Sequence, residues 1–185
     1  MLPSWEEPES RSLGADLAEQ LLDQRVIVLG GRLDDAAANR AAAQLLLLSR
    51  RSGRTPIELN LACPEAELSA ALALADTVEL AAPPVHAVIR GTLAGAAIAV
   101  LCAAEERAAP RHALLVLSMP RTSAEGTAAQ LANLAEHYER QVTRLRDTIV
   151  ATSGRSAEDV TKDLENGRVL SGEEAFEYGL VNRLL

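Results

Sequence analysis

The sequence predicts an α/β fold in which short parallel strands alternate with helices. Short apolar runs such as Arg25–Leu29 are each followed by a longer stretch with helical spacing of apolar residues. This alternation continues through the first two thirds of the chain and is typical of βαβ units with a parallel sheet. The chain has 185 residues, of which 48% are apolar, so it is long enough for one substantial core.

The chain is expected to form one domain preceded by a short arm. Residues 1–12 are polar and contain two prolines, which predicts a mobile N-terminal arm in front of a single domain over 13–185. Asp34 or Asp35 is placed to cap a helix, and Gly30 is expected to end the strand before it. The expected elements are a helix over 13–22, a strand over 25–29, a helix from about 35 to 51, a strand over 56–61, a helix over 65–80, a strand over 85–89, a buried helix over 95–104 and a strand over 114–117.

The last third of the chain has a different pattern. Residues 125–152 form one long helical repeat, which would reach roughly 37 Å at 1.5 Å per residue, so part of this helix is expected to project from the core. Its apolar stripe predicts an oligomerisation surface, composed of Leu131, Leu134, Tyr138, Val142 and Leu145. Two capping-box patterns beginning at Ser156 and Ser171 predict short helices before a final strand over 181–184.

Composition excludes several classes of partner. The formal net charge of −8 argues against binding to a nucleic-acid backbone, which needs clustered basic residues. The apolar runs are too short to span a bilayer, and the acidic first residues do not resemble a signal peptide. Cys63 and Cys102 have neither metal-type spacing nor a disulfide framework. We therefore expect a cytoplasmic protein without a metal or other cofactor and without a membrane or nucleic-acid partner.

Four stretches of the chain carry a resemblance to a known family. They are RVIVLGGRLDDAAANRAAAQLLLLSR at 25–50, ADTVELAAPPV at 75–85, GTLAGAAIAVLCAA at 91–104 and GRVLSGEEAFEYGLVNRLL at 167–185. Together they resemble the proteolytic subunit of the Clp protease (ClpP), a serine peptidase with a crotonase-like fold. The resemblance implies repeated β-β-α and βαβ units, and it implies that the helix at about 125–152 is the projecting handle helix of that family.

The family's peptidase chemistry needs a nucleophilic serine, a histidine that accepts its proton and an aspartate that orients the histidine. By the resemblance, Gly95 stands where the family has the serine, in the run Gly91–Ala97. Ser118, directly before Met119 and Pro120, stands in place of the histidine, and Gly167 stands in place of the aspartate. This sequence therefore predicts a catalytically degenerate paralogue that is not an enzyme.

The resemblance marks two further regions as altered. The oxyanion loop of the family corresponds to residues 62–67, where Glu65 and Ala66 stand in place of two glycines, so the loop is expected to repel the charge that it should stabilise. The pocket in which the family receives loops of its unfoldase falls at Glu58, Asn60 and Leu80, which are not aromatic, and is expected to be degraded.

Several other residues are candidates to replace the missing groups. Cys63 is a candidate nucleophile beside the altered loop, although small buried cysteines are common in protein cores. The three imidazoles belong to His86, His112 and His137, and either of the first two is a candidate base, with an ordinary surface position as the alternative. Ser118 and Ser123 are expected near the cleft, but a hydroxyl needs a base to become a nucleophile.

Three hypotheses about function follow from the resemblance. The favoured one is a non-catalytic ClpP-like subunit of bacterial origin, assembled into heptameric rings or a tetradecamer with active ClpP subunits, with a structural or regulatory role and contact to a Clp AAA+ ATPase through those partners. The first alternative is a self-assembled ring that binds peptides or a protein without cutting them. The second is a crotonase-like acyl-CoA enzyme in which Glu65 or Glu67 serves as an acid or base.

Overall fold

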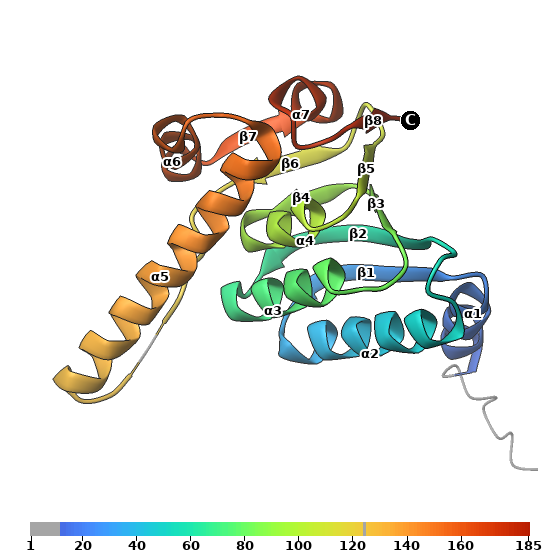
Figure 1. Cartoon of the computed structure of the whole chain (residues 1–185). Helices are drawn as coiled ribbons and strands as arrows, with labels where there is room; N and C mark the ends of the chain where they lie inside the picture. The colour runs from blue at the N-terminus through green and yellow to red at the C-terminus, as the bar shows by residue number, and fades with distance from the viewer. Residues whose placement is uncertain (1–11, 124) are drawn as a thin grey trace, which may run out of the picture.

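The computed structural model describes residues 12–123 and 125–185, and within these ranges it forms an α/β fold of seven α-helices and eight strands (Figure 1). The predicted fold class is confirmed. Apart from Val88 and Ala108, the buried apolar side chains of the described residues form one hydrophobic core. The predicted mobile arm over 1–12 lies outside the described residues except for Ser12, which begins the first helix.

The larger sheet is entirely parallel. Its strand order is β1-β2-β3-β5-β8, with bounds β1 Val26–Leu33, β2 Ile57–Ala66, β3 Val85–Ile89, β5 Glu106–Ala109 and β8 Arg183–Leu184. Helices α2 (Asp35–Arg51) and α3 (Leu68–Glu79) cover one face of this sheet (Figure 1). Alternation along β2 explains the layering, because Leu59 and Leu61 are fully buried toward the helices whereas Glu58 is only partly buried.

A second, smaller sheet was not expected from the sequence. It has the order β4-β6-β7, with bounds β4 Thr92–Ala94, β6 Leu114–Leu117 and β7 Arg168–Ser171. Strand β4 pairs with β6 in parallel, whereas β6 and β7 are antiparallel. Strands β4, β5 and β7 have only three or four residues and lack the continuous apolar run that marked β6, which is why they escaped prediction from sequence.

Two predicted boundaries near the end of β1 were wrong. The glycines at 30 and 31 do not end β1, because pairing with β2 continues to Leu33 opposite Ala66. The ladder is irregular between Gly30 and Arg32, and Gly31 adopts a left-handed φ of +79°, so the glycines form a bulge within the strand. Strand β2 correspondingly runs to Ala66, which turns most of the expected loop at 62–67 into strand and delays α3 to Leu68.

The predicted helices are otherwise confirmed, with shifts of a few residues at their ends. Helix α1 spans Ser12–Asp23, and Asp34 caps α2 by accepting from the amide of Ala37. A 3-10 turn at Gly95–Ala97 continues into the buried helix α4, Ile98–Cys102. Helices α6 (Ala157–Asn166) and α7 (Gly172–Tyr178) begin at the serine caps that the sequence indicates.

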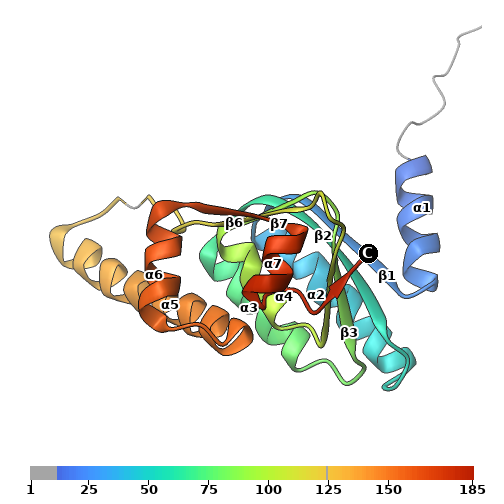
Figure 2. The same cartoon turned by 90° about the horizontal axis from the view of Figure 1, so that it is seen from above.

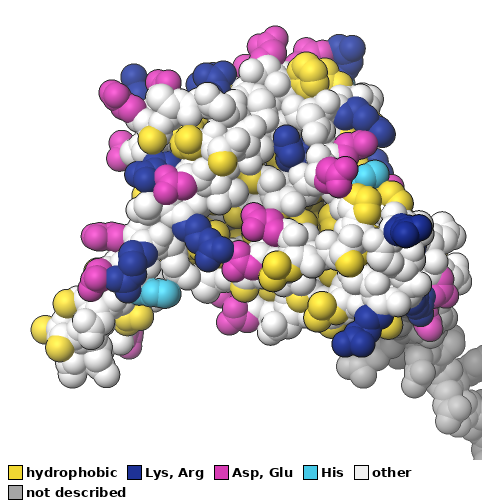
Figure 3. Space-filling view, in the orientation of Figure 1, with side chains coloured by type: hydrophobic (Ala, Val, Ile, Leu, Met, Phe, Trp, Pro, Cys, Tyr) yellow, Lys and Arg dark blue, Asp and Glu magenta, His cyan; other side chains and the backbone are white. Residues whose placement is uncertain are grey.

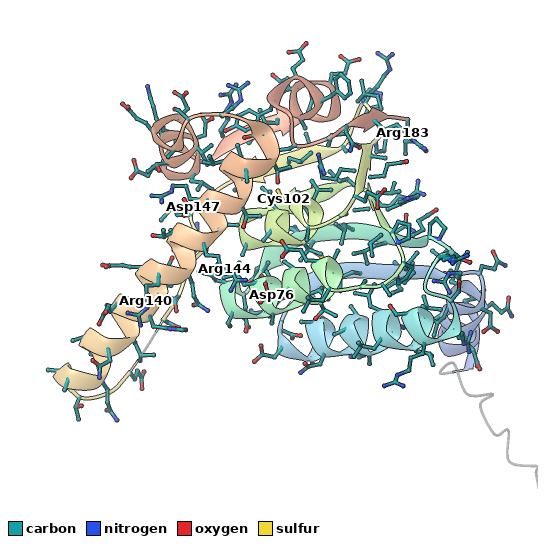
Figure 4. The ribbon with its side chains drawn as sticks, in the orientation of Figure 1. Asp76, Cys102, Arg140, Arg144, Asp147 and Arg183 are labelled. Atoms are coloured by element: carbon teal, nitrogen blue, oxygen red, sulfur yellow. The ribbon has the colours of Figure 1, made fainter. Side chains whose placement is uncertain are left out.

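The long helix α5 spans Ala128–Ser153, three residues shorter at its start than expected because Thr127 forms the capping box there. Its C-terminal half lies against the core, where an ion pair joins Arg144 to Asp76 of α3 (Figure 4). Its N-terminal half projects away from the body, at the opposite end of the molecule from α1 (Figures 1 and 2). No helix in the described ranges is both long and apolar enough to cross a membrane.

Candidate functional site

A cleft of about 690 Å³ opens where the two sheets meet. One wall comes from the C-terminal ends of β1 and β2, with Arg32, Glu65 and Glu67. The floor comes from β4 and the turn that follows it, and the other wall comes from the residues after β6 and from the connection between α6 and β7. Ends of several strands thus converge on one hollow, which is where α/β folds place their ligand sites.

The structure brings the three predicted triad positions into this cleft. Gly95 begins the turn after β4, Ser118 follows β6, and Gly167 lies between α6 and β7. A Cβ atom added at Gly95 would lie 3.4 Å from the Ser118 hydroxyl oxygen. Gly95 has a left-handed φ of +55°, as expected for a sharp strand-to-helix turn that presents a residue at a site. The three positions, which are far apart in the sequence, thus lie around one cleft.

The α6–β7 connection is held against the end of β6. The amide of Met119 donates to the carbonyl of Leu164 at 3.0 Å, which keeps the last turn of α6 beside Ser118. Gly167 caps α6 with a left-handed φ of +67°, and no atom lies within 4 Å of the position that its Cβ would take. A side chain at 167 would therefore have free space at the edge of the cleft.

Among the described residues that line the cleft, Ser118 and Thr92 carry hydroxyl groups, and no imidazole or thiol is present. His86 lies on β3, next to Glu58 of β2 in the ladder, and the exposed His112 lies in the turn before β6. Ser123, expected near the cleft, instead lines an apolar hollow beside α5 together with His137. The structure therefore does not bring any histidine to Ser118.

The segment expected as an oxyanion loop has a different role in the structure. Residues 62–66 continue β2 and pair with β1 on one side only. On the other side the pairing with β3 ends at Leu61, whose carbonyl accepts the last hydrogen bond from the amide of Arg90 at 2.7 Å. The other edge of this segment borders the cleft, where Pro64, Glu65 and Ala66 are lining residues. Within the described strands, the cleft thus has a backbone edge that is not used by the sheet.

The carboxylates of this segment are paired rather than isolated. Arg32 binds Glu65 at 3.1 Å and Glu67 at 2.7 Å, and these carboxylates raise the pKa of its guanidinium. Glu67 stands at the N-cap position of α3 without a capping bond from its side chain, since that side chain is turned toward Arg32. The expectation that Glu65 repels negative charge in the cleft did not take Arg32 into account. The bulge at Gly30–Arg32 directs this side chain toward the cleft, and the two adjacent glycines at 30 and 31 were the sequence signal for the bulge.

Cys63 lies beside the cleft but points away from it. Its side chain is fully buried, and its thiol donates to the carbonyl of Leu29 at 3.5 Å. Burial raises the pKa of Cys63 to about 11, and burial likewise raises the pKa of Cys102 to about 11. A thiol of this kind is neutral at pH 7, which favours the core-residue interpretation over the nucleophile.

We predict that alkylation of Cys63 by iodoacetamide is slow in the folded chain at pH 7 and becomes fast in urea, measured by mass spectrometry of the peptides. Because the folded pKa is raised above that of the unfolded thiol, the neutral thiol stabilises the fold below about pH 9, and this contribution is lost as the pH rises toward about 11. The Cys63→Ala variant should therefore lose less stability than the native chain over that pH range. Rapid labelling of native Cys63 at pH 7 would contradict this assignment.

The residues at the expected unfoldase pocket form a polar network. Asn60 is buried and donates to Glu58 at 2.7 Å, and the Arg90 guanidinium contacts both side chains. Leu80 lies at the end of α3 with its side chain 85% exposed. This surface of β2 is therefore hydrogen-bonded and charged where the resemblance implies aromatic side chains.

The predicted oligomerisation stripe on α5 divides into two parts. Leu145 is fully buried, and Tyr138 and Val142 pack against the core of the same chain. Leu131 and Leu134 remain 38% and 47% exposed on the projecting half, where apolar side chains gather at the tip (Figure 3). Of this stripe, the part with Leu131 and Leu134 is thus the one available to another chain.

In the described ranges, no three histidine, cysteine, aspartate or glutamate side chains are grouped so that they could hold a metal ion.

Comparisons with known proteins identify the family. The sequence model described as Clp protease matches residues 9–185. The chain is 34% identical over 171 residues to "ATP-dependent Clp protease proteolytic subunit 1" of Streptomyces avermitilis, covering 91% of this chain and 79% of that protein. It is 33% identical over 172 residues to the proteolytic subunit of Dehalococcoides mccartyi, covering 92% and 86%. It is also 33% identical over 190 residues to "proteolytic subunit 2" of Corynebacterium jeikeium, covering 100% and 90%.

These names correct one prediction from the sequence. The expectation that the chain is not an enzyme is contradicted, because relatives that align with more than nine tenths of it are named as proteolytic subunits of an ATP-dependent protease. The prediction inferred a loss of activity from the residues at only three positions, Gly95, Ser118 and Gly167. Family membership rests instead on a match to residues 9–185. By both the matched length and the identity of its relatives, this chain belongs to the Clp protease family.

Proposed function

We propose that the chain assembles into rings with other Clp protease subunits and that its cleft binds peptide segments inside the assembly. Membership of a family whose relatives are named proteolytic subunits supports the complex. Peptide binding in the cleft is supported mainly by the unpaired backbone edge of residues 62–66, which borders a hollow between the two sheets.

The cleft suits an extended peptide. A strand that enters it can hydrogen-bond to the open edge of β2, as in other cases of β-strand addition. The floor offers small and apolar contacts from Ala94, Gly95 and Val116, which leave room for substrate side chains. The hydroxyl of Ser118 and the side chains of Arg32 and Arg121 supply polar contacts around this floor.

Assembly is expected to use the projecting half of α5. Leu131 and Leu134 are exposed there beside an apolar hollow that also involves Tyr138, and the Tyr138 hydroxyl is anchored by the carbonyl of Pro120. Exposed leucines on a projecting helix are a surface that a second subunit can bury. The helix is held at its base by Arg144 and Asp76, so the tip is presented in a defined direction.

The outer face of β2 supports a different role in the complex. Glu58, Asn60 and Arg90 satisfy one another, so this face offers few apolar contacts to a hydrophobic loop. We propose that contact with a Clp ATPase depends on partner subunits in the ring.

The assembly is tested by Leu134→Arg, with Asn133→Arg as the matched control on the adjacent, exposed position of α5. A charged side chain in a buried contact between subunits costs several kcal/mol, so Leu134→Arg should shift the assembly to smaller species, whereas Asn133→Arg should not. Native mass spectrometry and electron microscopy should be applied to the chain alone and after co-expression with a second proteolytic subunit. A native chain that stays monomeric in both samples would overturn the proposal, and rings formed by the chain alone would favour a homomeric assembly.

Peptide hydrolysis should be measured on the same samples, because the names of the relatives connect this family with proteolysis. The acyl-CoA alternative is not favoured by the cleft, in which two carboxylates already compensate the positive charge of Arg32 that nucleotide phosphates would need. Turnover of an acyl-CoA substrate in a thioester hydratase assay would support that alternative.

A further inference from the structure

The charges around the cleft are distributed unevenly between its walls. The wall formed by β1 and β2 carries Arg32, Glu65 and Glu67, so two carboxylates face one guanidinium. The wall formed after β6 and at the end of α6 carries Arg121 and Glu165, whose charges balance. The β1–β2 wall is therefore left with one uncompensated negative charge.

The contacts of Arg32 show where this charge is available. Its guanidinium contacts Oε1 of Glu65 and Oε1 of Glu67, which leaves Oε2 of each carboxylate as a further acceptor. The side chains of Glu65 and Glu67 are 66% and 40% exposed, so a ligand can reach both. Asp34, which caps α2, adds another negative charge near Arg32, since it too raises the pKa of that guanidinium.

The placement of Arg32 is built into the strand. The bulge at Gly30–Arg32 and the left-handed Gly31 direct this side chain toward the end of β2. Arg32 is thereby held between Glu65 and Glu67, which compensate its positive charge. A bound carboxylate would compete with Glu65 and Glu67 for this guanidinium.

We propose that the Arg32–Glu65–Glu67 wall makes the cleft selective for peptide segments with a lysine or arginine side chain over segments with an acidic one. The inference rests on the proposed binding of peptides in the cleft. A cationic side chain of a peptide lying along the open edge of β2 meets the free carboxylate oxygens of Glu65 and Glu67, whereas an acidic side chain is repelled by them. The exposure of this wall limits the preference to about threefold at low salt.

The test uses the purified full chain and two fluorescent peptides of the same length, identical except for one central lysine or glutamate. Binding is measured by fluorescence anisotropy at low and high sodium chloride. We expect the lysine peptide to bind about threefold more tightly at low salt, with the difference shrinking at high salt because exposed charges are screened. Equal affinities of both peptides at low salt would overturn the selectivity and leave peptide binding intact.

A matched pair of variants locates the effect. Glu65→Gln combined with Glu67→Gln removes the negative charge and frees Arg32, so the preference should disappear or reverse toward the glutamate peptide. Glu139→Gln changes the net charge on the exposed side of α5, outside the cleft, and should retain the native preference. A double variant that keeps the native preference would contradict the assignment to this wall, and binding of neither peptide by the native chain would overturn the proposed function together with this inference.

Discussion

Replacing Gly172 with alanine is expected to destabilise the fold by about 3 kcal/mol, near the upper end of the usual cost of overpacking. A Cβ atom at this position would lie 2.1 Å from the carbonyl oxygen of Pro110, which is backbone and cannot rotate away. The amide of Gly172 donates to the carbonyl of Arg111 at 3.2 Å, and Ser171 caps the same helix through a capping box. The start of α7 is therefore held too closely to the segment before β6 to accept a methyl group.

Urea unfolding followed by circular dichroism measures this effect. Gly30→Ala is the matched control, because no atom lies within 4 Å of the position of its Cβ and its φ is not in the left-handed region. We expect Gly30→Ala to leave the unfolding midpoint unchanged or slightly raised, since alanine costs less backbone entropy than glycine. A Gly172→Ala protein with the native midpoint would show that α7 is not docked as the structure places it.

Installing a complete triad is expected to have the largest effect on chemistry. We propose that Gly95, Ser118 and Gly167 occupy the positions of the family's serine, histidine and aspartate, which their convergence in one cleft supports. The triple substitution Gly95→Ser, Ser118→His and Gly167→Asp should hydrolyse a fluorogenic peptide about a hundredfold faster than the double variant Ser118→His, Gly167→Asp, which is a fraction of what a triad contributes in an evolved peptidase.

The geometry favours this result at two of the three positions. A side chain at 95 would start 3.4 Å from the present Ser118 oxygen, within reach of an imidazole at 118. The left-handed conformation of Gly167 is tolerated by aspartate, and space is free there. Gly95→Ser carries about 1 kcal/mol of strain from its left-handed φ.

The control for the triad is Ser118→His with Gly167→Asp, in which Gly95 is kept. This double variant should hydrolyse the peptide no faster than the native chain, and only the triple variant should be labelled at position 95 by a fluorophosphonate probe, as read by mass spectrometry. If the triple variant is neither labelled nor faster than the double variant, the three positions do not form a triad geometry.

The helices of this protein were predictable from local chemistry. Helix caps are short-range signals, so Ser156, Ser171 and one of Asp34 and Asp35 were identified as starts of helices, and the structure selects Asp34 of the two aspartates. The apolar stripe of α5 predicted one long helix in the same way. The stripe did not reveal which of its residues face the chain's own core, because Leu145 and Leu134 have the same spacing but opposite exposure.

The sequence singled out three residues that line the cleft, but it did not predict the walls of the cleft. Gly95, Ser118 and Gly167 were identified by motif, and the structure places them together. The glycines at 30 and 31 were interpreted as the end of a strand, since glycine more often interrupts strands than continues them. Pairing of β1 with β2 beyond this point decided otherwise, and that pairing joins residues more than thirty positions apart.

The sequence by itself determined the α/β alternation, the capping residues of α2, α6 and α7 and the family of this protein, because these depend on local spacing and on motifs along the whole chain. Only the tertiary structure decided that a second sheet exists, that residues 62–66 form an open strand edge, and that Arg32 lies between Glu65 and Glu67. These features depend on which distant segments become neighbours. Such contacts are selected by the energy of the whole packed core rather than by any one stretch of residues.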